Sequence, residues 1–177
     1  MTGTLMMTRN FSNQLSGQIG EALVVAELGR MGIVATAFAG NVPDIDILAY
    51  KDGKSTAVQV KAWKKGSVSF DARRFLDIEF DGDRQLVKGI QPHLERLPIY
   101  VFVRIAETKA QDEFFVVDQL TLASIVNEGY LAFLNLHGGI RPRNPNTTHN
   151  SVTVSQLEPF KDNWDVLLRA LRSLEET

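Results

Sequence analysis

The residues of this chain best suited to chemistry are two acids, one amide and one ammonium in its first third. Glu21 falls in a predicted helix, Asp46 begins an apolar run, and Gln59 and Lys61 stand two residues apart in the next extended segment. Two carboxylates and an amide oxygen form a hard oxygen site, which suits Mg²⁺ or Mn²⁺ and does not suit zinc. A lysine beside such a site can orient a bound water and neutralise charge developing on phosphorus. The set is therefore typical of metal-assisted hydrolysis of a phosphate ester.

The segment 41–63 predicts the hairpin that positions three of these side chains. An apolar run over residues 45–50 is followed by Lys51-Asp52-Gly53-Lys54 and by a second run over residues 57–63. Two short runs joined by an Asp-Gly turn are a β-hairpin signal. Because side chains alternate along a strand, Gln59 and Lys61 share one face. Such groups are costly to bury unless they pair or bind something.

The fourth side chain belongs to a helix predicted from residue 12 or 13, where Ser or Asn can cap it, to about residue 31. Gly32 follows as its stop. Glu21 lies close to the apolar stripe of this helix, and a solvated helix position is the alternative interpretation of this residue. Gly17 and Gly20 flank it, and two glycines inside one helix indicate close approach to the sheet, since each costs roughly 1 kcal/mol.

These residues resemble the PD-(D/E)xK nuclease superfamily, which includes restriction endonucleases and archaeal Holliday-junction resolvases. The resemblance rests on Glu21 in a first helix, on Pro43-Asp44-Ile45-Asp46-Ile47-Leu48-Ala49 and on Gln59-Val60-Lys61, and it covers about residues 14–63. It implies a restriction-endonuclease-like core of α/β (mixed α+β) class, with a central mixed sheet flanked by helices. It also implies a metal-dependent endonuclease that hydrolyses phosphodiester bonds of DNA with Mg²⁺ or Mn²⁺.

The resemblance assigns catalytic roles to Glu21, Asp46, Gln59 and Lys61, and metal ligation to Asp46, Gln59, Asp44 and Glu21. Asp44 matches the Pro-Asp dipeptide of the superfamily, whereas Asp46 better matches an acid that opens an apolar strand, so Asp46 ranks first. Gln59 replaces the usual acid, as in Mrr-like restriction enzymes. A neutral amide is a weaker ligand, so the alternative is a catalytically silent module of the same fold that binds nucleic acid or a partner protein.

Basic residues outside this set predict contacts to nucleic acid. The formal net charge is −2, so such binding must come from local basic patches. The candidates are Lys64, Lys65, Arg73, Arg74, Arg141 and Arg143. The polar loop over residues 141–150 is interpreted either as a flap over a nucleic-acid backbone or as disorder. Trp63 either stacks on a base or packs in the core, and the isolated histidines are expected at the surface.

The remaining elements are predicted from periodicity and turn residues. Residues 81–92 are expected to be irregular, the helix after Asp118 is expected to end near Glu128 or to continue to Leu136, and residues 138–150 are expected to be loop. Strands are predicted over residues 33–39, 67–70, 75–80, 98–106, 113–117 and 151–154, and a terminal helix over 161–174. Trp164 and Leu168 of that helix are expected in the core or at a dimer contact.

Length and composition predict one globular domain over residues 13–177 after a flexible leader over residues 1–12. The chain has 177 residues, 44% of them hydrophobic and 23% charged, which is ordinary globular composition. It has no cysteine, which excludes disulfides, cysteine-ligated zinc and thiol catalysis. It shows neither a secretory signal nor a membrane-spanning run, so a cytoplasmic location with no membrane partner is expected. A homodimer is a further expectation, because cutting two strands needs two sites.

Overall fold

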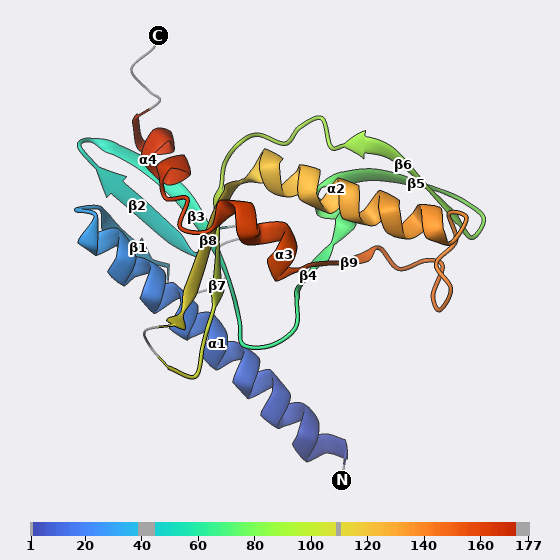
Figure 1. The fold of residues 1–177 in the computed structure, drawn as a ribbon, viewed down its shortest axis with the longest axis horizontal. Coiled ribbons are helices and arrows are strands. Elements are labelled where there is room, and N and C mark those ends of the chain that lie inside the picture. Colours follow the sequence, from blue (N-terminus) through green and yellow to red (C-terminus); the bar gives the residue numbers. More distant parts are fainter. Residues whose placement is uncertain (1, 39–44, 109–110, 173–177) are drawn as a thin grey trace.

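The computed structural model describes residues 2–38, 45–108 and 111–172, with side chains from Gln14 onward. Asp44, one of the predicted metal ligands, lies outside the described residues. Figure 1 shows the arrangement of the elements, with α1, α4 and strands β1 to β3 on the left and α2 with strands β4, β5, β6 and β9 on the right. The elements and their bounds are α1 (Thr2–Arg30), β1 (Val34–Ala37), β2 (Ile47–Lys51), β3 (Lys54–Trp63), β4 (Val68–Asp71), η1 (Ala72–Arg74), β5 (Leu76–Asp81), β6 (Arg84–Ile90), β7 (Ile99–Arg104), β8 (Glu113–Asp118), α2 (Gln119–Leu136), β9 (His149–Val152), α3 (Val154–Leu157), η3 (Glu158–Phe160) and α4 (Asp165–Arg172).

A five-stranded sheet with the strand order β1-β2-β3-β7-β8 forms the centre of the fold. The pair β3–β7 is parallel, and the other neighbours in this sheet are antiparallel. Two smaller antiparallel sheets, β4–β9 and β5–β6, lie apart from it. The predicted class, a mixed α+β fold with a central mixed sheet and flanking helices, is confirmed.

The two faces of the central sheet are covered by different helices. Val60 and Val101 face a core that includes buried residues of α1 and α4. Tyr100 and Phe102, which alternate with Val101 along β7, face a second core built with α2 and the small sheets. β7 is apolar on both faces, and its residues therefore form a continuous apolar run in the sequence. Such a run is typical of a strand covered on both sides, as predicted for residues 98–106.

The predicted hairpin is formed by β2 and β3. The register pairs Lys51 with Lys54, so Asp52 and Gly53 form a two-residue turn. Both turn residues have positive φ, +50° and +83°, as a type I′ turn requires. The Asp-Gly pair therefore sets the register that later places the residues of the candidate site.

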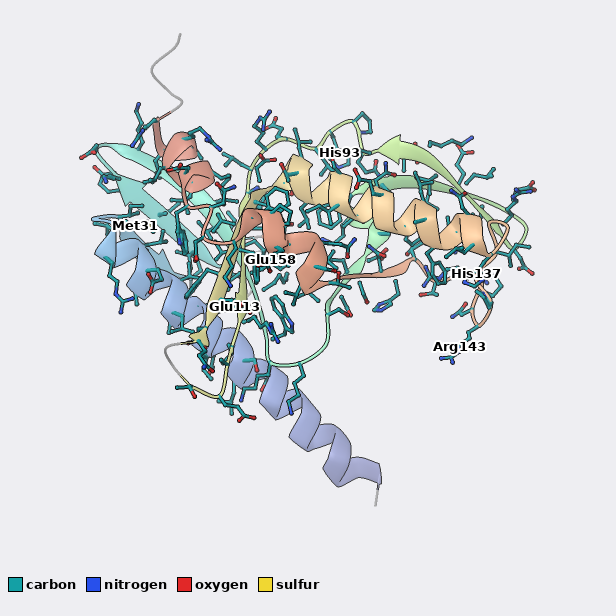
Figure 2. All side chains as sticks on the ribbon, in the orientation of Figure 1. Met31, His93, Glu113, His137, Arg143 and Glu158 are labelled. Carbon is teal, nitrogen blue, oxygen red and sulfur yellow. The ribbon has the colours of Figure 1, made fainter. Side chains whose placement is uncertain are left out.

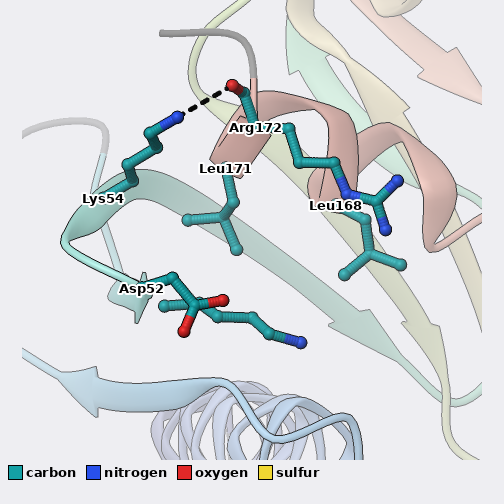
Figure 3. Close-up of a pocket in the computed structure, with 6 residues that line it drawn as sticks. Asp52, Lys54, Leu168, Leu171 and Arg172 are labelled. Carbon is teal, nitrogen blue, oxygen red and sulfur yellow. Dashed lines mark hydrogen bonds between the residues drawn. The ribbon is translucent and has the colours of Figure 1, made fainter. Parts of the chain in front are cut away.

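The tip of this hairpin ties the ends of two helices together. Lys51 Nζ donates to the carbonyl of Met31 just after α1, at 3.2 Å, and Lys54 Nζ donates to the carbonyl of Arg172 at the end of α4, at 3.0 Å. Figure 3 shows the small pocket between the hairpin and α4, with the bond from Lys54. Cations at helix C-termini are favourable, so Lys51 and Lys54 of this pocket stabilise the fold.

α1 begins ten residues earlier than its predicted start, at Thr2 instead of residue 12 or 13. The stretch expected as a flexible leader is therefore helical in its backbone. Residues 2–11 contain no proline and include Leu5, Met6 and Met7, which are good helix formers. Extending an existing helix avoids the cost of nucleation, so Ser12 and Asn13 lie inside the helix instead of capping it.

The stretch over residues 81–92, expected to be irregular, contains β6. Asp81 pairs with Arg84, which leaves Gly82 and Asp83 as a two-residue turn. Gly82 has a φ of +56°, the left-handed value that a type II′ turn needs at its first position. The same kind of Asp-Gly signal that predicted the β2–β3 hairpin therefore also specifies this one.

Of the helices in the last third, α2 continues to Leu136, one of its two expected ends, whereas the terminal helix differs from expectation. α2 is capped by Asp118, whose side chain accepts from Thr121 N at 2.9 Å, and it runs through Gly129 to Leu136. A Cβ at Gly129 would lie 3.0 Å from the Gln156 side chain, so this glycine allows α3 to pack closely. The predicted terminal helix over residues 161–174 is shorter, because its first residues follow the turn of η3 and the helix begins at Asp165.

Within the described residues, no helix is long and apolar enough to cross a membrane.

Trp164 packs on Phe114 at 5.7 Å between ring centroids and is partly buried against the core beneath α4.

Candidate active site

Asp46 stands immediately before β2, at a point where three strands meet. Its backbone N–H donates to the carbonyl of Val58 at 3.0 Å, and its own carbonyl accepts from Phe38 N at 2.9 Å. These two bonds continue the pairing of β2 with β3 and with the end of β1. The position of the Asp46 backbone is thus fixed by the sheet.

The side chain of Asp46 bends toward the part of β3 that extends beyond β2. The pairing of β2 with β3 ends at Ile47 and Val58. Two residues further along β3, Val60 N donates to Asp46 Oδ2 at 2.6 Å. The Gln59 side-chain amide donates to the same oxygen. Both of these hydrogen bonds end on Oδ2. Oδ1 is the oxygen that can turn toward a ligand.

Glu21 reaches the site because α1 packs very closely on β3. A Cβ built at Gly20 would lie 2.3 Å from the Cβ of Ala62, so only glycine permits this approach. Gly17, also predicted to mark close packing, has nothing within 4 Å of such a Cβ. The predicted close approach is therefore confirmed at Gly20 and wrong at Gly17.

Burial raises the pKa of Glu21, and the negative charge of Asp46 raises this pKa further. Two carboxylates that are 25 positions apart in the sequence are thus near enough for the charge of one to act on the other. Two acids that repel each other in a partly buried setting are stabilised by a shared proton or by a cation. A solvated helix position, the alternative for Glu21, does not describe this environment.

Gln59 and Lys61 follow the predicted alternation along β3. Val58 and Val60 point to the core beneath α1, and Gln59, Lys61 and Trp63 belong to the opposite face. Gln59 is 6% exposed, and Lys61 is half-buried. The structure therefore brings Gln59 into contact with Asp46, and Lys61 follows Gln59 two residues along the same face of β3.

The donor set fits a hard divalent cation. The described residues contain no group of three or more His, Cys, Asp or Glu placed to hold a metal ion, so a cation here would use the two carboxylates with amide or backbone oxygens. Such a set matches Mg²⁺ or Mn²⁺, which keep several waters and bind few protein ligands. The Gln59 amide would have to rotate before its oxygen could join them, because its nitrogen now faces Asp46.

Two of the predicted nucleic-acid contacts follow the strand that carries Gln59 and Lys61. Lys64 and Lys65 are exposed in the connection after β3. They line a hollow of about 650 Å³ together with Ile19 of α1 and Arg104 of β7. Lys64 is three residues beyond Lys61, and Ile19 is two residues before Glu21. The hollow is also lined by Glu107 and Glu113, and neither Glu21 nor Asp46 borders it.

The other predicted contacts belong to the second half of the fold. Arg73 lies over the ring of Phe80, with its guanidinium carbon 5.0 Å from the ring centroid, and Arg74 is its neighbour in η1. Arg141 lies 4.7 Å from the ring centroid of Phe133. Arg143 is exposed in the loop after α2. These four arginines are part of a surface separate from the carboxylate pair.

Trp63 is a core residue. It is 8% exposed, and its ring packs against Phe115 and Phe102 at centroid distances of 6.5 and 6.4 Å. Of the two alternatives for this residue, packing in the core is confirmed, and stacking on a base is excluded by its burial. All three histidines are exposed, as expected.

Sequence reasoning missed two contributors. The backbone N–H of Val60 binds Asp46, and no side-chain pattern reports a backbone donor. Gln85 is 3% exposed in β6 and binds the loop after α2. The sequence signal for Gln85 is the alternation of exposed and more buried side chains at the start of β6. An irregular stretch over residues 81–92, as expected from the sequence, gives no such alternation.

No protein-family model and no curated protein matches the sequence. Among solved structures, the chain is similar to a bacterial homing endonuclease, I-Ssp6803I, with a TM-score of 0.54 and 15% sequence identity. The match covers 94% of this chain and 99% of that chain. At this identity the likeness concerns the fold, so the chain has the fold of a solved nuclease structure.

Proposed function

We propose that this protein is a metal-dependent endonuclease that hydrolyses phosphodiester bonds of DNA. The observation that carries the proposal is the hydrogen bond from Gln59 to Asp46, on the strand that also carries Lys61, in a fold shared with a homing endonuclease. The pKa of Glu21, raised by burial and by Asp46, supports it. The repulsion between the two carboxylates is the feature that a bound cation would relieve. The resemblance of these residues to the PD-(D/E)xK superfamily supports the same function.

Each residue of the set has a distinct role in this proposal. Asp46 and Glu21 would hold Mg²⁺ or Mn²⁺, which when bound supplies a polarised water and a contact to the scissile phosphate. Lys61 orients the attacking water and offsets negative charge on the phosphate as the bond breaks. Gln59 keeps the Asp46 carboxylate in place through its amide and contributes its oxygen on rotation.

Lys64 and Lys65 would contact the DNA backbone next to the site. Both lysines are exposed directly after β3, the strand that carries Gln59 and Lys61, and this supports a contact with phosphates flanking the cleaved bond. Such contacts give affinity without sequence preference, and they weaken with added salt. Cutting both strands requires two such sites, so the proposal includes two copies acting on one duplex.

A catalytically silent module that binds nucleic acid or a partner protein is the second candidate. It is favoured by one observation, the Gln59 amide donating to Asp46, because this bond satisfies the carboxylate without any metal. The two candidates predict opposite results with a chelator. Binding by a silent module is unaffected by EDTA, and no product forms with any metal.

The test is incubation of the full chain with supercoiled, linear, single-stranded and branched DNA, and with RNA, in Mg²⁺, Mn²⁺ or EDTA. The proposal predicts nicked or linear DNA products in either metal and none in EDTA. Intact DNA of every form, across both metals and with binding retained, would establish the silent module instead. A Mn²⁺ soak of crystals adds an independent measurement, with anomalous density expected between Asp46 and Glu21.

A further inference from the structure

The loop that joins α2 to β9 is held in place by one buried amide. Gln85 of β6 donates through Nε2 to the carbonyl of Thr147 at 3.0 Å and to that of Pro145. Its Oε1 accepts from the hydroxyl of Tyr130, and its backbone N–H donates to Gly139 O at 2.9 Å. Burial raises the pKa of Tyr130, so its hydroxyl stays protonated and remains a donor at neutral pH. Both ends of the loop are therefore attached to the same residue.

Further contacts fix the remaining parts of the loop. Thr148 Oγ1 donates to Asp71 at 2.6 Å, and its carbonyl accepts from Ala72 N at 2.8 Å. Arg141 stacks over the rings of Phe133 and Tyr130. Neither a flexible flap nor disorder, the two sequence-based interpretations, describes a loop with these contacts.

The contacts separate the polar residues of the loop into those that hold the loop together and those that are exposed without such a role. In the first group, Arg141 stacks on the rings of Phe133 and Tyr130, and Asn144 closes a turn by accepting from Asn146 N at 3.2 Å. Arg143 and Asn146 have exposed side chains, and Figure 2 shows Arg143 projecting away from the body of the domain. Pro142 directly precedes Arg143 and Pro145 directly precedes Asn146. The ring of each proline restricts its own backbone angle φ.

The charge of this region favours a polyanionic partner. Residues 129–157 include no Asp or Glu, although the whole chain has 21 acids in 177 residues. The same stretch includes two arginines and two histidines. Arg73 and Arg74 stand two and three residues after Asp71, which binds the loop at Thr148. The exposed Arg143, Asn144 and Asn146 of the loop are thus cationic or amide groups that can bind both phosphates and base edges, and the exposed carboxylate of Asp71 accepts from Thr148.

We infer that the loop over residues 141–149 is a preformed element that reads base edges of duplex DNA through Arg143 and Asn146. An arginine can make two hydrogen bonds to guanine, and an asparagine can make two to adenine, in the major groove. A preformed loop loses little conformational entropy on binding. The inference rests on the proposed function and deepens it, because it names the part of the chain that selects the sequence.

The covalent chain limits how far this contact lies from the candidate catalytic site. Asp71, which binds Thr148 of the loop, stands ten residues after Lys61. Ten residues span at most about 35 Å, and stacked base pairs in a duplex are about 3.4 Å apart. Arg143 is five residues from Thr148, which adds at most about 17 Å. The base pairs read by the loop would therefore lie within roughly two helical turns of the cleaved bond.

The test measures sequence selectivity in EDTA, where no cleavage interferes. The full chain is used to select sites from a randomised duplex pool, and its affinity for the selected duplex is compared with that for a scrambled duplex. The double variant Arg143→Ala/Asn146→Ala is expected to lower the ratio of the two affinities at least tenfold. The control Arg30→Ala removes one exposed cation from the end of α1 and is expected to leave the ratio unchanged.

A second variant separates positioning from direct contact. Tyr130→Phe removes only the hydroxyl that binds Gln85, so it is expected to lower selectivity several-fold while affinity for the scrambled duplex stays near that of the wild type. Unchanged selectivity of the double variant would overturn the inference, as would a wild-type chain that selects no sequence. If the protein selects a site through Arg143 but cuts no DNA, the proposed function fails and this inference stands. If it cuts DNA while the double variant keeps its selectivity, the reverse holds.

Discussion

The Gln59 side chain donates its amide hydrogen to Oδ2 of Asp46, across the junction of β2 and β3. The same oxygen accepts the backbone N–H of Val60. Gln59 stands where the PD-(D/E)xK pattern, which this segment resembles, usually has an acid. It is therefore the glutamine at this position that holds the carboxylate of Asp46. A neutral donor in this position limits the negative charge of the site when no metal is bound, which an acid could not do.

Gln59→Glu is expected to raise metal affinity and to lower the stability of the metal-free protein. A third carboxylate would add a charged ligand, but it would replace a hydrogen bond with repulsion against Asp46. Loss of a bond to a charged group costs about 1–3 kcal/mol. Calorimetric titration with Mn²⁺ and thermal unfolding in EDTA measure the two effects. Gln14→Glu, the same change at an exposed position of α1, is the control, and equal effects of the two changes would contradict the account.

Glu21→Gln is expected to stabilise the metal-free protein at neutral pH. The folded protein raises the pKa of Glu21 through burial and through Asp46. The stability linked to this group is therefore fully present below the pKa of the unfolded chain, about 4.3, and is lost as pH rises through the higher folded-state pKa. The amide variant removes this loss.

The measurement is the unfolding midpoint between pH 4 and pH 8 in EDTA. The difference between the variant and the wild type should grow across the lower part of this range and then level off. In saturating Mg²⁺ the order should reverse, because binding to the folded state stabilises the wild type more. A difference that does not depend on pH would mean that Glu21 and Asp46 do not interact.

Gly20→Ala and Gly17→Ala are expected to change stability in opposite directions. The Cβ added at Gly20 would lie 2.3 Å from that of Ala62, whereas the one at Gly17 meets nothing within 4 Å. Overpacking typically costs about 1–3 kcal/mol, and replacing a helical glycine by alanine at an open position gains about 0.5–1 kcal/mol. Urea unfolding of both variants is the measurement. Equal stability of the two would show that α1 does not pack on β3 through Gly20.

The sequence predicted the hairpin and the polar face of the site because both depend on local rules. The Asp52–Gly53 turn sets the register, and alternation then places Gln59 and Lys61 on one face. The Asp-Gly signal at Gly82 was present as well, but the stretch after it was assigned as irregular. Applying the turn rule at both positions would have predicted β6.

Contacts between distant segments were beyond local rules. The bond from Val60 N to Asp46 depends on where the pairing of β2 ends. The bonds from Gln85 to Thr147 join residues 62 positions apart. The start of α1 was missed for another reason, because Ser12 and Asn13 are good caps that a longer helix does not use.

The loss of DNA nicking in Lys61→Ala tests the central claim most directly. The rate of conversion of supercoiled plasmid to nicked circles in Mg²⁺ is measured for the wild type, for this variant and for Lys88→Ala, which removes a lysine ion-paired to Glu79 on the β5–β6 hairpin. The account predicts a metal-dependent rate for the wild type, a loss of at least about 100-fold in Lys61→Ala and no change in Lys88→Ala, with all three folded. A wild-type rate retained in Lys61→Ala, or no nicking by the wild type in any metal, would contradict it.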